Sequence, residues 1–103
     1  MNKEERRTNQ RIPLNLQARY DGMSGVHEAK IEDISMGGCF VNTRGHVEPG
    51  ESITVEIKLP SGQWLQLRGQ VTSRQPGIGF GIVFSLRTEE EISSLSNLLT
   101  SHT

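Results

Sequence analysis

The sequence predicts an all-β fold, a six-stranded antiparallel β-barrel with a C-terminal α-helix and a flexible basic N-terminal arm. Three observations support this fold class. Apolar and polar residues alternate with a two-residue period in several short segments, glycine and proline signals separate these segments, and a helical period appears only near the C-terminus. Because no helical pattern falls between the strands, an antiparallel barrel is favoured over a parallel sheet.

The first residues have almost nothing to bury. Residues 1–11 (MNKEERRTNQR) carry four basic side chains and only one apolar side chain, Met1. Such a segment gains too little from burial to offset the entropy lost on ordering. We therefore predict a mobile arm over residues 1–12 and one barrel domain with its helix over residues 13–103.

The predicted strands follow this arm. Alternation begins after Pro13 and recurs in residues 51–59 (ESITVEIKL) and 64–71 (WLQLRGQV), and the PSG turn at residues 60–62 predicts that the last two pair as a hairpin. Residues 77–84 (GIGFGIVF) continue the period, and their glycines indicate curvature or close backbone approach. The side chains expected on inward faces of the first and last of these strands are Leu14, Leu16, Ala18, Tyr20, Ile78, Phe80, Ile82 and Phe84.

The C-terminal segment has the signals of one amphipathic helix. Thr88 and Glu91 have the spacing of a capping box at a helix start. The residues expected on its apolar face are Ile92, Leu95, Leu98 and Leu99. This face is expected to pack against the barrel or against a partner.

Composition narrows the possible functions. A length of 103 residues fits one domain, and a formal net charge of −1 argues against a surface for duplex nucleic acid. The single cysteine, Cys39, cannot form an internal disulfide, and its apolar strand indicates a core position. The N-terminus lacks the apolar core of a secretory signal, and no apolar run reaches the ~20 residues of a membrane helix. We therefore expect a cytoplasmic protein without membrane insertion.

Two short motifs contain the residues best suited to binding a ligand. Arg7 and Arg11 stand four residues apart in RRTNQR, and Asp33, Ser35 and Gly38 have the spacing D-x-S-x-x-G in DISMGG. Each motif has an ordinary explanation, because charged tails are common, and Asp, Ser and Gly are frequent turn residues.

Together, in this order and followed by a barrel pattern, the motifs resemble the PilZ domain family, bacterial receptors for cyclic di-GMP. The resemblance covers nearly the whole chain. Residues 11–20 (RIPLNLQARY) resemble the family's first strand, residues 47–57 (VEPGESITVEI) its Pro-Gly turn and following strand, and residues 79–84 (GFGIVF) its late glycine-rich strand. The resemblance implies a non-enzymatic receptor whose ligand is cyclic di-GMP, with no cofactor and no metal.

The chemistry of this ligand makes the match intelligible. Cyclic di-GMP presents two phosphodiesters and two guanines. The guanidinium forks of Arg7 and Arg11 suit the phosphates and the guanine O6/N7 edge. The Asp33 carboxylate suits the guanine N1 and N2 hydrogens, and the Ser35 hydroxyl can donate or accept at the same site.

The remaining predicted site residues are Gly37, Gly38 and Arg6. The two glycines have no side chain that keeps a ligand from the backbone, and their N–H groups are expected to be free to meet an oxygen. Arg6 directly precedes the arginine pair, and arginine there resembles PilZ domains that bind two stacked nucleotides. The arm, residues 1–12, would then be a ligand-binding segment whose ordering transmits the messenger level to a downstream protein of motility, pilus or polysaccharide synthesis.

Three other functions remain open from the residues alone. An enzyme needs a nucleophile with a base or a set of metal ligands, but Ser35 lacks the G-x-S-x-G elbow and His27, His46 and His102 are scattered. A single-stranded nucleic-acid barrel would need more stacking aromatics than the five present. A protein-docking module without nucleotide binding would not need the two motifs. Trp64 is either an exposed aromatic beside a ligand or partner, or an ordinary strand-edge residue.

Overall fold

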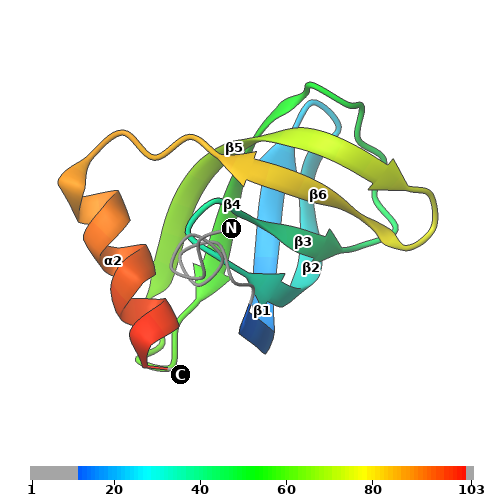
Figure 1. The fold of residues 1–103 in the computed structure, drawn as a ribbon. Coiled ribbons are helices and arrows are strands. Elements are labelled where there is room, and N and C mark those ends of the chain that lie inside the picture. The colour runs from blue at the N-terminus through cyan, green and yellow to red at the C-terminus, as the bar shows by residue number, and fades with distance from the viewer. Residues whose placement is uncertain (1–11, 102–103) are drawn as a thin grey trace, which may run out of the picture.

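The computed structural model of the protein describes residues 12–101. Six antiparallel strands close into a barrel in the order β1-β2-β3-β6-β5-β4, and one helix, α2, follows the last strand (Figure 1). The elements are β1 (Ile12–Gly22), β2 (Gly25–Ile34), β3 (Gly38–Asn42), β4 (Ser52–Lys58), β5 (Trp64–Gln75), β6 (Gly79–Phe84) and α2 (Glu89–Thr100). The predicted six-stranded barrel with a C-terminal helix is confirmed, whereas the predicted mobility of the arm concerns residues outside those described, apart from Ile12, which begins β1.

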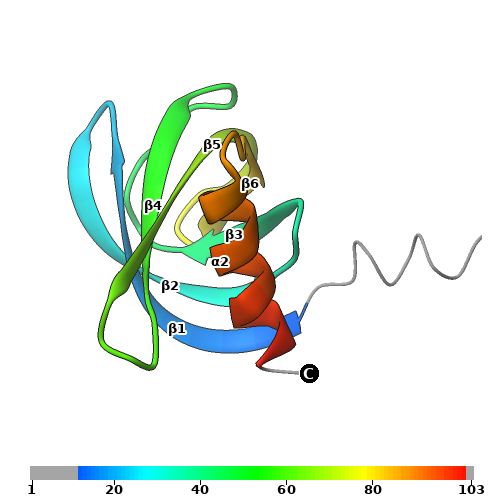
Figure 2. The same ribbon diagram turned by 90° about the vertical axis from the view of Figure 1, so that its left-hand side faces the viewer.

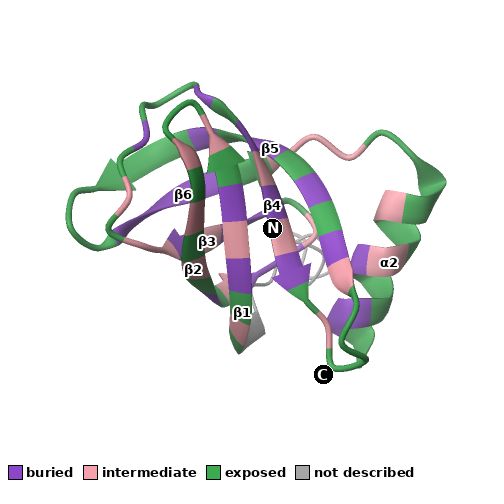
Figure 3. Ribbon diagram, turned by 180° about the vertical axis from the view of Figure 1, so that it is seen from behind, coloured by how far each residue is buried: buried purple, intermediate pink, exposed green. Residues whose placement is uncertain are grey.

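The interior of the barrel is apolar, as the two-residue period predicts. Buried side chains alternate with partly exposed ones along β4 and with exposed ones along most of β5 (Figure 3). Tyr20 and Phe80 are the largest of the fully buried side chains, and their rings pack edge to face with centroids 5.1 Å apart. Burial raises the pKa of the Tyr20 hydroxyl. Cys39 is fully buried in the same core, which confirms its predicted core position.

The hairpin of β4 and β5 is confirmed as well. Ile57 lies opposite Leu65, and the chain reverses through residues 60–62, where Gly62 takes a φ of 92°. The glycines of β6 allow close approach of backbone, since a Cβ added at Gly79 would lie 2.1 Å from the carbonyl oxygen of Val41 in β3.

Two side chains predicted to face inward are instead exposed. Ile78 is 58% exposed because it belongs to the turn of residues 76–78, so the strand period does not extend to it. Ile92 is 44% exposed, because the buried part of α2 lies one turn further along the helix.

The helix packs against the barrel. Leu95, Leu98 and Leu99 belong to the same core as the strands, and α2 covers one side of the barrel (Figure 2). The predicted capping box is present: the Thr88 hydroxyl accepts from the Glu91 N–H at 3.0 Å, and the Glu91 carboxylate accepts from the Thr88 N–H at 3.0 Å. Hydrogen bonds from the backbone N–H groups of Arg87 and Thr88 lower the pKa of Glu91. Within residues 12–101, α2 falls short of the length and apolar character that crossing a bilayer requires.

Candidate functional site

The bend between β2 and β3 is held by its own hydrogen bonds. The Ser35 N–H donates to the Gly38 carbonyl at 2.8 Å, and the Ser35 hydroxyl accepts from the Gly37 N–H at 3.2 Å. The same hydroxyl donates to the Gly38 carbonyl at 3.4 Å. Ser35 is only 5% exposed, so its hydroxyl serves mainly to shape the bend. The Gly37 N–H, expected to be free for a ligand, is therefore already bonded in this structure.

Strand β6 also anchors this bend. The Phe84 N–H, at the end of β6, donates to the Gly37 carbonyl at 2.8 Å. Sequence reasoning missed this contact, because β-pairing partners far apart in the chain leave no local signal at either residue. The bend is thus fixed from both sides, by Ser35 within it and by Phe84 across it.

The backbone of β6 lies so close to Gly38 that there is no room for a side chain at this position. Gly38 begins β3 opposite Val83, and a Cβ placed on it would lie 2.0 Å from the Ile82 carbonyl oxygen. Positive φ values within residues 12–101 occur at other glycines, namely Gly25, Gly50, Gly62 and Gly77. Gly38 is also buried, whereas Gly37 is exposed, so the turn explanation of the glycine pair is wrong for Gly38.

Asp33 lies where three strands meet at this bend. It is partly buried in β2, opposite Pro13 of β1 and Phe40 of β3. The register shifts between Ile31 and Asp33 on one side and between Pro13 and Leu16 on the other. Such irregularities bend a strand and redirect its side chains, and they are frequent next to functional sites.

The register of β1 brings the start of that strand to the same place. Ile12 lies opposite Ile34, and Pro13 lies opposite Asp33. The residue that directly follows Arg11 is therefore held against the strand that leads into the bend. The predicted site residues Arg6, Arg7 and Arg11 lie outside the described residues, so their roles stay predictions.

Within residues 12–101, the other sequence candidates do not gather into a second cluster. No cluster of three or more His, Cys, Asp or Glu side chains suited to a metal ion occurs within the described part of the chain. The ring of half-buried Trp64 is covered by Arg19, whose guanidinium carbon lies 4.2 Å from the ring centroid. Arg19 also donates to Glu56 at 2.7 Å, so Trp64 takes part in a packed cluster on the outer face of β1, β4 and β5.

The structure is thus a small closed barrel with a polar bend between β2 and β3, and the start of β1 pairs with the strand that leads into this bend. The chain belongs to the PilZ domain family, whose model (PilZ domain) matches residues 5–101. PilZ domains are typically receptors for cyclic di-GMP.

Individual relatives agree with this membership. The chain is 28% identical over 104 residues to the alginate biosynthesis protein Alg44 of Pseudomonas putida, a match that covers 96% of this chain and 27% of that protein. The chain thus spans about a quarter of this curated relative.

Solved structures share the fold at lower identity. The PilZ domain of CeSA from a cellulose-synthesizing bacterium superimposes with a TM-score of 0.72 at 21% identity, over 89% of this chain and 96% of that one. The PlzA protein of Borreliella burgdorferi, solved in complex with c-di-GMP, gives a TM-score of 0.62 at 17% identity, over 95% of this chain and 37% of that one. At these identities the likeness concerns the fold.

Proposed function

We propose that this protein is a receptor for cyclic di-GMP that binds the nucleotide between its N-terminal arginines and the bend of residues 33–38. The pairing of Pro13 with Asp33 carries the proposal, because it brings the chain just after Arg11 next to the bend. Membership of the PilZ family, with both motifs intact, supports the choice of ligand.

The roles of the site residues follow from their chemistry and from the geometry of the bend. The guanidinium groups of Arg7 and Arg11 bind the phosphates or a guanine O6/N7 edge. The Asp33 carboxylate accepts from the guanine N1 and N2 hydrogens. Ser35 contributes mainly by holding the bend, and Gly37 is the exposed backbone position over which a ligand can lie.

Isothermal titration calorimetry with cyclic di-GMP tests this function. We expect binding in the micromolar range or tighter, without consumption of the ligand. The absence of binding at ~100 μM, equivalent to about 5.5 kcal/mol, would reject the proposal. Mixed single-stranded oligonucleotides serve as the comparison, since a nucleic-acid barrel would bind them in preference.

The number of cyclic di-GMP molecules bound per chain is expected to depend on Arg6. We expect two nucleotides per chain, because a further guanidinium can bond to or stack on a second guanine. Replacing Arg6 by leucine should reduce the calorimetric stoichiometry from two toward one, since an aliphatic side chain offers neither interaction. A one-to-one titration of the unmodified protein would contradict this prediction and leave the receptor function intact.

Ordering of the arm is the expected signal to the partner. The segment from Arg6 to Arg11 has no apolar side chain, so ordering it costs about 1–2 kcal/mol per residue that burial cannot offset. Charge-assisted contacts to the nucleotide, each worth about 1.5–3 kcal/mol, oppose this cost only when the ligand is bound. Amide hydrogen exchange should show residues 6–11 unprotected without ligand and protected with it, while the barrel strands change little. An arm protected to the same extent in both states would place the output elsewhere.

The ordered arm would act on a downstream protein. We propose that this partner belongs to motility, pilus or polysaccharide-synthesis machinery. The alginate biosynthesis relative is consistent with the last of these. An affinity pull-down with and without cyclic di-GMP should recover the partner in only one of the two states.

Ser35 should contribute less to the affinity for cyclic di-GMP than the charged site residues, because its hydroxyl mainly stabilises the bend. Replacing it by alanine leaves the Gly37 N–H without its acceptor, which costs about 1 kcal/mol of stability and lowers the Tm by about 4–8 °C. Ser35→Thr keeps the hydroxyl and is the matched variant. A thermal unfolding midpoint unchanged by the alanine substitution would show that the bend does not depend on this hydroxyl.

A further inference from the structure

A groove of about 640 Å³ lies on the outer face of β1, β2 and β3, and we call it the Lys30 groove. The residues that line it are Asn15, Gln17, Glu28, Ala29, Lys30 and Asn42. Lys30 lies at its centre, because it is opposite Gln17 of β1 on one side and opposite Asn42 of β3 on the other. Three adjacent strands thus place polar side chains in one row across the groove.

The Lys30 groove continues the face of the barrel on which Asp33 lies. In β3, Val41 is fully buried, so its neighbours Phe40 and Asn42 face outward. Asp33 of β2 lies opposite Phe40. Lys30 lies opposite Asn42, so it shares this outer face with Asp33. The two pairs are two residues apart along β3, which is about 7 Å. A dinucleotide held at Asp33 is long enough to reach the groove.

The polar ends of the lining side chains are available to a ligand. With respect to the other residues of 12–101, the side chains of Asn15, Lys30 and Asn42 make no hydrogen bond or ion pair, and the Glu28 carboxylate is likewise unpaired. The charges of Glu28 and Lys30 balance, so the groove does not select a ligand by its net charge. It offers hydrogen-bond donors and acceptors close together instead.

This combination suits the edges of a guanine. Guanine presents hydrogen-bond donors at N1 and N2 and acceptors at O6 and N7. The Glu28 carboxylate can accept from the donors, and the Lys30 ammonium can donate to the acceptors. The carboxamides of Asn15 and Asn42 can do either, and the aliphatic stem of Lys30 offers apolar surface to the face of the base. We propose that the Lys30 groove binds a guanine of cyclic di-GMP other than the one that Asp33 recognises.

The inference rests on the proposed function and extends its site along β2 and β3. A phosphate is a poorer occupant of the groove than a base, because the unpaired Glu28 carboxylate would repel it. The phosphates would then stay with the arginines of the N-terminal segment, and the groove would contribute selectivity for the base.

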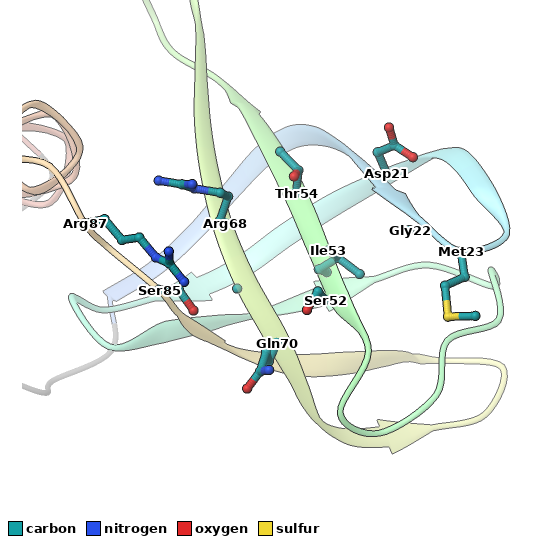
Figure 4. A pocket seen from close by; sticks show the side chains of 11 residues that line it. Asp21, Gly22, Met23, Ser52, Ile53, Thr54, Arg68, Gln70, Ser85 and Arg87 are labelled. Atoms are coloured by element: carbon teal, nitrogen blue, oxygen red, sulfur yellow. The ribbon is translucent and has the colours of Figure 1, made fainter.

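A second groove, which shares no lining residue with the Lys30 groove, is lined by residues of β1, β4 and β5 and by the chain after β6 (Figure 4). Arg68 in this groove pairs with the Glu91 carboxylate at 3.5 Å. Asp21 lines the same groove as Arg87, so neither charge is in excess there. Gln70 is an exposed carboxamide of this second groove and therefore suits as a control.

Isothermal titration calorimetry with cyclic di-GMP tests the Lys30 groove. Lys30→Ala and Asn42→Ala should each weaken binding about fivefold, because each removes a hydrogen bond to the base. Lys58→Ala and Gln70→Ala are the matched controls, since both residues are exposed on β4 and β5 and do not line the groove. Both controls should leave the affinity unchanged. Thermal unfolding of each variant checks that the barrel is intact.

A second ligand separates a contact to guanine from a merely structural effect. The mixed dinucleotide 3′,3′-cyclic GMP-AMP carries one guanine and one adenine, and adenine lacks the N1 and N2 hydrogens that Glu28 would accept. The unmodified protein should therefore bind cyclic di-GMP about tenfold more tightly than the mixed dinucleotide. Glu28→Ala should reduce this preference to about threefold.

Three results would overturn the proposal. Unchanged affinity in Lys30→Ala and Asn42→Ala, or an equal loss in the two controls, would remove the groove from the binding site and leave the receptor function standing. An undiminished preference for cyclic di-GMP in Glu28→Ala would show that the groove does not read a guanine. No binding of cyclic di-GMP by the unmodified protein would reject the receptor function and this inference together.

Discussion

Replacing Arg7, Arg11 or Asp33 by alanine is expected to weaken cyclic di-GMP binding at least tenfold in each case, while the barrel remains folded. Each substitution removes a charge-assisted hydrogen bond, and such bonds are worth about 1.5–3 kcal/mol. A loss of about 1.4 kcal/mol is a tenfold change in Kd. Calorimetry measures the affinity, and thermal unfolding checks the fold.

Alanine variants of two other exposed charged residues, Glu32 and Arg44, are the controls. Glu32 precedes Asp33 in β2 and is exposed, so Glu32→Ala removes a carboxylate one residue away from the proposed contact. Arg44→Ala removes an exposed arginine from the loop after β3. Both should bind the nucleotide with nearly unchanged affinity. If the alanine variants of Arg7, Arg11 and Asp33 also keep their affinity, the site lies elsewhere on the protein.

The fold was largely predictable because its signals are local. Alternation marks strands whose two faces differ in burial, and the capping box at Thr88 and Glu91 lies within one helical turn. The errors occurred at the ends of elements. Ile78 and Ile92 continue the apolar period into a turn and into the exposed first part of α2, where tertiary packing decides burial.

The sequence motif predicted which residues of the candidate site lie together, but not the hydrogen bonds that shape it. Asp33, Ser35 and Gly38 stand out by residue type and spacing, and the structure brings all three to one bend. The burial of Ser35 and the hydrogen bond from the Phe84 N–H to the Gly37 carbonyl could not be predicted from the sequence. The contact with Phe84 depends on β6, which is more than 40 residues away in the chain and next to β3 in the barrel.

Gly38→Ala is expected to be the most damaging single-methyl change near the site. The added Cβ would lie 2.0 Å from the Ile82 carbonyl oxygen and 3.3 Å from the Val83 Cα, both of which are backbone atoms. Backbone in a paired strand cannot rotate away, so β3 and β6 must separate where they meet. Overpacking typically costs about 1–3 kcal/mol, and we expect a value at the upper end, about 3 kcal/mol. The Tm should then fall by more than about 10 °C.

Displacing Gly38 should also weaken cyclic di-GMP binding. The Gly38 carbonyl accepts a hydrogen bond from the Ser35 N–H, and this bond holds the bend. Gly81→Ala is the matched control: Gly81 lies in the same pairing of β3 and β6, opposite Phe40, but its added Cβ would meet only the side-chain oxygens of Ser73 and Thr72. These hydroxyls can change rotamer, so the loss in Tm should be smaller and nucleotide affinity should be nearly retained. Equal losses of Tm and affinity in the two variants would contradict a special role for the close backbone contact at Gly38. A greater loss of affinity in Gly38→Ala would instead link the close backbone contact at Gly38 to the shape of the ligand site.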